Sequence, residues 1–273
     1  MTTTTAPVAP PAAGRRAGDF TNVLRAELAK LTTMSSAYWA VLVAFAANIG
    51  FAVLAAALLA PRLKPGDLAH VDVVQLALAG LHLSQVSFGV LGALVITGEY
   101  GTGMIRTTFA AVPRRRTVLA AKGLVFAGTA LLTATLSTVV AYLAFLAALP
   151  AQTLTGTALG DPGVTRAVLG GGLYLTVYGL LGFGLGALLR SSAATIATLL
   201  GVLFVPPLLL NLLPETWKTT VGPYIPMQSG SQIFVAARHE AASLAPWTGF
   251  GVFSLYAAVA LVAAFAIANR RDA

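Results

Sequence analysis

The sequence predicts an all-α integral membrane protein with six transmembrane helices, preceded by a helix that lies in the membrane interface. Hydrophobic residues make up 57% and charged residues 10% of the 273 residues, whereas a soluble domain carries about 25% charged residues. Six stretches also lack Asp, Glu, Lys and Arg over the ~20 residues that cross a bilayer as a helix. These stretches cover residues 37–60, 73–97, 123–149, 167–189, 193–213 and 247–268.

The N-terminal region divides into a tail and an amphipathic helix. Residues 1–18 are rich in Thr, Ala and Pro and lack the apolar core of a signal peptide, so we expect a disordered cytoplasmic tail. Asp19 is a suitable N-cap for a helix over residues 19–33. Arg25 and Lys30 lie on one face of this helix. The opposite face is apolar at three- and four-residue spacing: Phe20, Val23, Leu24, Leu28 and Leu31. This pattern predicts a helix in the inner membrane interface, with a solvated helix as the alternative.

Residues 34–273 are expected to form one membrane domain. Only residues 190–192 separate the fourth and fifth spans, which predicts a tight turn between antiparallel helices. Within the fifth span, Pro206 and Pro207 remove two backbone donors and predict a kink or a break. The segment 214–246 is too apolar for a free loop, so we expect one or two short helices dipping into the outer leaflet, with a plain folded loop as the alternative.

The charged residues are distributed unevenly across this topology. With the N-terminus inside, twelve of the 17 Lys and Arg residues and four of the nine Asp and Glu residues fall in cytoplasmic segments. The other five basic and five acidic residues cancel outside, so the whole net charge of +8 lies on the inner face. Because Lys and Arg resist translocation, both termini are expected in the cytoplasm.

Composition and motifs also exclude several classes of function. The pI of 10.2 is explained by the membrane topology, which places basic residues next to anionic lipids. No nucleic-acid partner is expected, because no basic face is interleaved with aromatic residues. The absence of Cys excludes disulfides and thiolate metal sites. The segment 239–243 lacks the second His of a zinc helix, so no metal site is expected. The sixth span has no His, which disfavours an intramembrane serine protease.

The most specific motif lies between the second and third spans. Residues 98–109 read GEYGTGMIRTTF, and Pro113, three arginines at 114–116 and Lys122 follow. This wording resembles the first intracellular loop of ABC-2-type transporter permeases. The resemblance implies an ABC-2 (type V) exporter fold in a bacterial plasma membrane, and its specific wording is confined to residues 98–122.

In that family the loop carries a short coupling helix that docks on a separate ATPase subunit. The resemblance therefore implies two ATPase subunits beneath a pair of permeases, the second permease being another copy of this chain. ATP and Mg²⁺ would bind to the ATPase, and this chain would bind no cofactor itself. The residues expected to couple to the ATPase are Glu99, Tyr100, Arg106, Phe109, Arg114 and Arg115.

Glu99 is the leading candidate, because a carboxylate at the C-terminal end of a helix is disfavoured by the helix dipole. A compensating cation is expected, and Arg106 or the arginines at 114–116 are close in sequence. A solvated Glu99 without a partner is the alternative. The three arginines could equally anchor the loop to lipid phosphates.

His82 and Gln85 lie one turn apart in the second span and project from one face. A polar pair at this depth should face protein or a cavity, so a substrate path and an interhelical hydrogen bond both remain open. In the resembled family the second and fifth spans line the pathway at the dimer centre. Pro206, Pro207 and Asn211 are therefore further pathway candidates.

The expected function is that of a permease subunit in an ATP-driven exporter. The spans lack the Asp, Glu, Lys and Arg residues that ion-coupled carriers commonly hold there. The chain also lacks the G-x-x-x-x-G-K-S/T loop that cradles nucleotide phosphates, so the ATPase must be another polypeptide and this chain is not itself an enzyme. The alternatives are an ATP-independent channel or secondary carrier, and a membrane scaffold that does not transport.

Overall fold

The computed structural model describes residues 16–59, 73–112, 114–149, 158–236 and 243–268, and every regular element among them is a helix. Six of these helices are long and apolar enough to cross a membrane. They are α2 (Ser35–Leu59), α4 (Leu81–Gly101), α6 (Arg115–Ala148), α7 (Val164–Leu189), α8 (Ser192–Asn211) and α11 (Pro246–Ile267). The predicted all-α, multi-pass membrane architecture is therefore confirmed. The tail was expected over residues 1–18; residues 1–15 lie outside the described part, whereas residues 16–18 belong to the first turn of α1 (Arg16–Thr33) and not to a tail.

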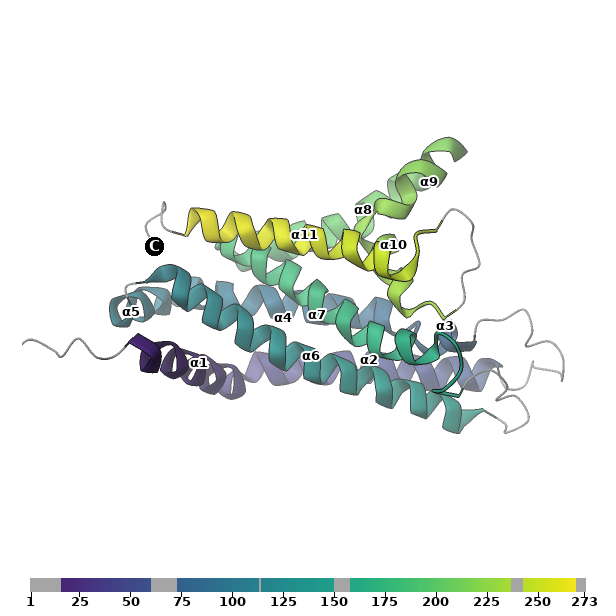
Figure 1. The fold of residues 1–273 in the computed structure, drawn as a ribbon, viewed down its shortest axis with the longest axis horizontal. Coiled ribbons are helices and arrows are strands. Elements are labelled where there is room, and N and C mark those ends of the chain that lie inside the picture. The colour runs from purple at the N-terminus through teal and green to yellow at the C-terminus, as the bar shows by residue number, and fades with distance from the viewer. Residues whose placement is uncertain (1–15, 60–72, 113, 150–157, 237–242, 269–273) are drawn as a thin grey trace, which may run out of the picture.

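The shorter elements gather at the two ends of the bundle (Figure 1). At one end lie α1 (Arg16–Thr33) and α5 (Met104–Ala111). At the other end lie α3 (Val73–Ala77) and α10 (Pro226–Ser231). The segment after α8 forms α9 (Glu215–Val221) and the 3₁₀ turns η3 (Gly222–Tyr224) and η4 (Gln232–Phe234) on either side of α10. Short helices were expected in this segment, and residues 237–242 of it lie outside the described part.

Helix α7 is the centre of the bundle and packs against α4, α6, α8 and α11. It crosses α4 backbone to backbone, because a Cβ atom on Gly182 would lie 2.2 Å from the carbonyl oxygen of Gly89. On the other side of the crossing, a Cβ atom on Gly92 would lie 1.9 Å from the oxygen of Gly179. Glycines on both helices thus permit a separation that no larger residue allows.

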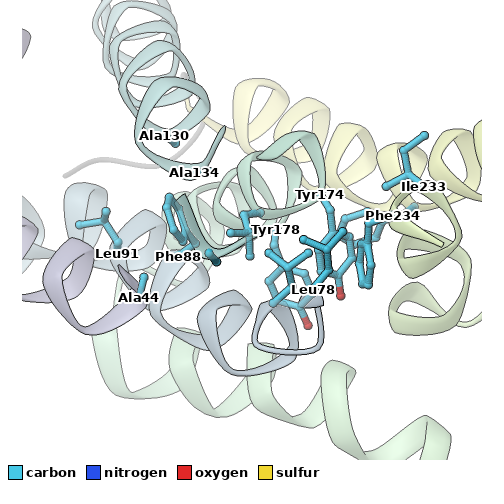
Figure 2. Packing of buried hydrophobic residues seen from close by; sticks show 14 of the residues in the cluster. Ala44, Leu78, Phe88, Leu91, Ala130, Ala134, Tyr174, Tyr178, Ile233 and Phe234 are labelled. Atoms are coloured by element: carbon cyan, nitrogen blue, oxygen red, sulfur yellow. The ribbon is translucent and has the colours of Figure 1, made fainter. Parts of the chain in front are cut away.

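An aromatic core fills the space beside this crossing (Figure 2). Tyr174 and Tyr178 on α7 are fully buried, and their ring centroids lie 5.8 Å apart in an edge-to-face arrangement. Phe253 of α11 packs on both tyrosines, and Phe234 of η4 packs on Tyr174. The core joins α11 and the segment after α8 to the central helix.

The second span is interrupted rather than continuous as predicted. Helix α3 ends at Ala77, and a turn at residues 78–80 precedes the start of α4. Gly80 in this turn lies against α2, where a Cβ atom would be 2.8 Å from the backbone of Asn48. The uncharged run of sequence concealed this break, because a hydropathy pattern does not distinguish a straight helix from two segments that pass a neighbour closely.

Helix α6 begins eight residues earlier than the third predicted span. Its 34 residues correspond to about 51 Å at ~1.5 Å per residue, which exceeds the ~30 Å hydrocarbon core of a bilayer. Lys122 consequently lies within the helix, about 10 Å from its start, where the charged side chain can occupy the interface rather than the hydrocarbon.

Helix α8 leads away from the centre, and α9 projects beyond the rest of the bundle (Figure 1). Pro206 and Pro207 lie inside α8, where a kink or a break was predicted. The helix continues through both prolines to Asn211, so the break does not occur. The apolar side chains of its second half, including Phe204 and Leu208, are exposed.

Candidate functional site

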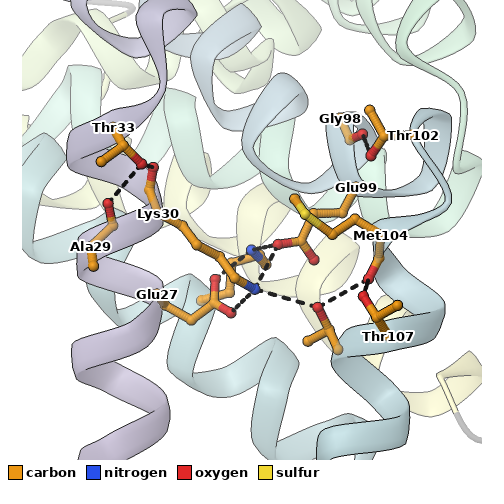
Figure 3. Close-up of polar contacts among 11 residues, drawn as sticks. Glu27, Ala29, Lys30, Thr33, Gly98, Glu99, Thr102, Met104 and Thr107 are labelled. Atoms are coloured by element: carbon orange, nitrogen blue, oxygen red, sulfur yellow. Dashed lines mark hydrogen bonds and ion pairs between the residues drawn. The ribbon is translucent and has the colours of Figure 1, made fainter.

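Four charged side chains meet where α1, α4 and α6 come together, and we call them the charge cluster: Glu27, Lys30, Glu99 and Lys122. Lys122 Nζ lies 2.5 Å from Glu27 Oε2 and 2.8 Å from Glu99 Oε1. Lys30 Nζ lies 2.8 Å from Glu27 Oε1 and 3.0 Å from Glu99 Oε1. Figure 3 shows Glu27 and Lys30 on α1 facing Glu99 on α4. Each lysine therefore bridges both carboxylates.

The positions of these residues follow from their helices. Glu27 and Lys30 are separated by one helical turn, so they project from the same face of α1. Glu99 lies two residues before the end of α4, and Lys122 lies in the third turn of α6. Because α1 packs along α6, the α1 pair meets the other two charges at one end of the bundle.

This arrangement corrects the predicted orientation of α1. Glu27 is buried and Lys30 faces the bundle, whereas Leu28 is exposed. The prediction that Lys30 lies on a polar face opposite the packing face of the helix was therefore wrong. Helix α1 also begins at Arg16, so Asp19 is not its N-cap. The apolar pattern did not predict the face of α1 that packs on the bundle, because Glu27 and Lys30 lie in the middle of that face.

The partners of Glu99 also differ from those expected. Sequence proximity suggested Arg106 or the arginines at 114–116, but the structure places Lys30 and Lys122 beside the carboxylate. Arg106 and Arg114 are exposed. The missed signal was Lys122 itself, which ended the charge-free run and was assigned to a loop.

Two other arginines stack on aromatic rings near the cluster. The Arg115 guanidinium lies 5.3 Å from the centroid of the Phe109 ring. The Arg190 guanidinium lies 5.2 Å from the centroid of the Tyr100 ring, and Arg190 adopts the left-handed conformation (φ 57°) that ends α7. The two stacks connect α5 with the start of α6, and the end of α4 with the end of α7.

The charge cluster is electrically balanced and largely withdrawn from solvent. Glu27 and Lys122 are 4% exposed and Glu99 is 5% exposed, while the side chain of Lys30 is 32% exposed. Burial lowers the pKa of Lys30, but the hydrogen bonds and charges of Glu27 and Glu99 outweigh burial and hold that pKa above its ordinary value of 10.5. The Lys30 side chain is therefore positively charged at neutral pH.

One acceptor of the cluster is left over. Glu99 Oε1 accepts hydrogen bonds from both lysines, but Glu99 Oε2 is buried and has no hydrogen-bond partner within the described residues. Glu99 also forms part of the wall of a cavity of about 420 Å³ between α1, α4 and α6. A buried charged acceptor without a donor is costly, so a donor that reached Glu99 Oε2 would be stabilised there.

Helix α5 lies next to the cluster at the end of the bundle (Figure 1). Gly103 adopts a left-handed conformation (φ 72°) that turns the chain sharply from α4 into α5. Ile105 is buried beneath the helix, while Met104, Arg106 and Thr107 are exposed. The helix therefore presents a mixed apolar and basic outer face, in the segment predicted to contact a partner.

A hydrogen bond connects α5 directly to the cluster. Lys30 Nζ donates to Thr108 Oγ1 over 3.4 Å, so Lys30 contacts residues of α1, α4 and α5 together. Displacement of α5 would therefore disturb the contacts that Lys30 makes with α1 and α4. Tyr100, Phe109 and Arg115, predicted to act in coupling, lie within the same end of the bundle and share the lining of a small crevice.

The predicted pathway residues fall into two separate places. Gln85 is fully buried, donates to the carbonyl of His82 over 2.9 Å and accepts a hydrogen bond from the Tyr174 hydroxyl. The His82 ring packs edge-on against Phe234 at 5.6 Å. Pro207 and Asn211 instead line a cavity of about 250 Å³ together with residues of α9 and α10. The first group therefore packs against the aromatic core, and the second lines a cavity beside α9.

Comparison of the chain with known protein families and with curated proteins found no match. Within the described residues, no three His, Asp or Glu side chains gather in a way that could hold a metal ion. The candidate functional site therefore consists of the charge cluster and α5, both within or next to residues 98–122.

Proposed function

We propose that this chain is the permease subunit of an ATP-driven exporter and that two copies form the substrate pathway above two separate ATPase subunits. The observation that supports this proposal best is the direct connection of α5 to three other helices through the charge cluster. A short helix at the end of a bundle needs such a connection if pressure on it is to move the spans.

In this proposal the ATPase docks on the outer face of α5. Met104, Arg106 and Thr107 offer an exposed apolar and basic surface there, and Ile105 anchors the helix from below. Movement of α5 would reach α1 through the contact between Thr108 and Lys30, and α4 and α6 through Glu99. ATP and Mg²⁺ would bind to the ATPase, and this chain would convert its closure into a population shift between two bundle conformations.

The excess of positive charge supports a cytoplasmic location for the end of the bundle that carries α1 and α5. Arg106, Arg114 and Arg115 all lie at this end, and Lys and Arg near short loops favour retention inside. We accordingly propose a multi-pass protein of a bacterial plasma membrane with both termini in the cytoplasm and its basic loop close to anionic lipids.

We place the second copy of the chain against α8. The second half of α8 exposes apolar side chains at Phe204, Leu208 and Leu212 and lies away from the central helix. Pro207 and Asn211 lie next to this surface, and His82 and Gln85 pack against Phe234 and Tyr174 of the core. All four are kept as pathway candidates. Each copy would supply one part of the pathway wall, and the pathway would be complete only where the two copies meet.

The decisive test is reconstitution in proteoliposomes with the proposed ATPase partner. The complex should contain two copies of each chain, and its ATP hydrolysis should respond to substrate. The variant Arg106→Glu should weaken assembly by reversing a charge on the outer face of α5. The matched control is Lys218→Glu, a charge reversal at a partly exposed position on α9 at the opposite end of the bundle.

The isolated chain should neither hydrolyse ATP nor accumulate substrate. Transport by the isolated chain in response to an ion gradient would contradict the proposal and favour a secondary carrier. Equal assembly of Arg106→Glu and Lys218→Glu would show that α5 is not the docking surface.

A further inference from the structure

Two cavities adjoin along the groove between α1, α4 and α6. The first, of about 420 Å³, contains the charge cluster in its wall. The second, of about 450 Å³, is lined by mostly apolar side chains of α1, α2, α4 and α6. Leu31 of α1 lines both cavities, so they meet at that side chain. We call them the charged cavity and the apolar cavity.

The two cavities follow one another along the same helices. On α6 the charged cavity is lined by Lys122, Val125 and Phe126, and the next turns, at Thr129 and Thr133, line the apolar cavity. On α4 the same order holds, since Leu94, Val95, Gly98 and Glu99 line the charged cavity and Leu91 lines the apolar cavity. The groove therefore has a charged end and an apolar end, the division found in an amphiphile.

The chemistry of the charged end selects the headgroup. Glu99 Oε2 is a buried acceptor that lacks a donor, so the headgroup must donate a hydrogen bond. The four charges of the cluster sum to zero, so an anionic headgroup would add an unbalanced negative charge beside Glu27 and Glu99. A zwitterion adds no net charge, and a primary ammonium supplies N–H donors.

The apolar end opens toward the membrane. Tyr38 and Leu42 of α2 line the apolar cavity and are among the exposed large side chains of the bundle. In a membrane-spanning chain such side chains face hydrocarbon. An occupant can therefore slide its chain in from the bilayer while its headgroup reaches the charge cluster.

We propose that this groove binds a phospholipid with a primary-ammonium headgroup, phosphatidylethanolamine, with its ammonium on Glu99 and one acyl chain in the apolar cavity. The inference does not depend on the proposed transport function, because it concerns only the groove within one chain. A lipid bound here would lie between α1 and the spans, beside the contact between Lys30 and α5.

The test counts lipids that stay bound to the purified protein. The protein is equilibrated with phosphatidylethanolamine, phosphatidylcholine and phosphatidylglycerol in equal amounts, and retained lipid is measured by native mass spectrometry. Phosphatidylcholine has the same phosphate but no N–H donor. We expect about tenfold more retained phosphatidylethanolamine than phosphatidylcholine, the ratio that one charge-assisted hydrogen bond supplies.

Thr133→Phe should abolish this retention by filling the apolar cavity. The Thr133 hydroxyl donates to carbonyls of Thr129 and Ala130 in its own helix, so the substitution leaves the charge cluster untouched. The matched control is Leu136→Phe, on the exposed face of the same helix, which should retain lipid like the parent. Glu99→Gln should remove the preference for ethanolamine over choline.

Three results would overturn the proposal. They are equal retention of phosphatidylethanolamine and phosphatidylcholine, preferential retention of phosphatidylglycerol, and unchanged retention in Thr133→Phe. Each can be observed whether or not the chain takes part in transport, so failure here is distinguishable from failure of the proposed function.

Discussion

Replacing Lys122 with methionine tests the charge cluster most directly. Methionine has a similar length and fills the same space, but it removes the ammonium that contacts Glu27 at 2.5 Å and Glu99 at 2.8 Å. The two carboxylates would then share Lys30 alone, with Lys30 itself partly exposed. The substitution therefore leaves one net negative charge in a buried place.

The expected loss of unfolding free energy is about 3 kcal/mol. Breaking a buried ion pair by removing one partner costs roughly 3–5 kcal/mol, and Lys30 still compensates part of the remaining charge, which favours the lower end of the range. Removing one carboxylate charge as well should restore a net charge of zero in the cluster. The double variant Glu27→Gln with Lys122→Met should thus be less destabilised than the sum of the single variants.

The assay is reversible unfolding in mixed detergent micelles, monitored by helical circular dichroism. The chain offers a matched control in Lys218, which pairs with Glu215 at 3.2 Å on exposed α9. Lys218→Met should cost only about 0.5 kcal/mol, as surface pairs do. A cost for Lys122→Met as small as that for Lys218→Met would refute the view that the cluster holds α1 to the spans.

Three further perturbations test other parts of the structure. Gly182→Ala should lower the unfolding free energy by about 2 kcal/mol, because its Cβ meets backbone at 2.2 Å, whereas Gly201→Ala, with nothing within 4 Å, should raise it by up to about 1 kcal/mol in the same unfolding assay. Arg166 donates hydrogen bonds to three backbone carbonyls at and after η4, so Arg166→Leu should speed hydrogen exchange in η4, measured by mass spectrometry. The contribution of Lys30 is complete below pH 10.5 and is lost as pH rises through its higher folded pKa, so the destabilisation by Lys30→Met should be equal at pH 7 and pH 9.

The transmembrane architecture could be predicted from the sequence because charge-free runs of this length have one stable form in a bilayer. The boundaries could not be predicted as well. A charge ends a hydropathic run but does not end a helix, so α6 continues past Lys122 to Arg115. Conversely, the uncharged second span contains a turn at residues 78–80, where Gly80 lies against α2. A hydropathy pattern does not record such a contact.

Glu99 could be identified from the sequence, but its partners could not. A carboxylate near the end of an apolar helix needs compensation, and that argument depends on local sequence alone. Lys30 and Lys122 are 69 and 23 residues away along the chain. Lys30 meets Glu99 because α1 packs along α6, and Lys122 meets Glu99 because α4 and α6 come together at this end of the bundle. Nearby arginines were the natural expectation, yet Arg106 remains exposed on α5.

The placement of Glu27 explains why a helix that reads as interfacial is held to the bundle. An apolar stripe alone would let α1 rotate or slide in the interface, because lipid and protein are similar apolar surroundings. Two carboxylates and two ammonium groups at fixed distances permit only one register of α1. Any shift of α1 would separate the paired charges, and three of the four residues are only 4–5% exposed, so water could not replace the lost partners. The cluster therefore specifies the position of α1 more than it stabilises the fold. Because Lys30 also contacts Thr108, the same interactions that position α1 make it sensitive to any displacement of α5.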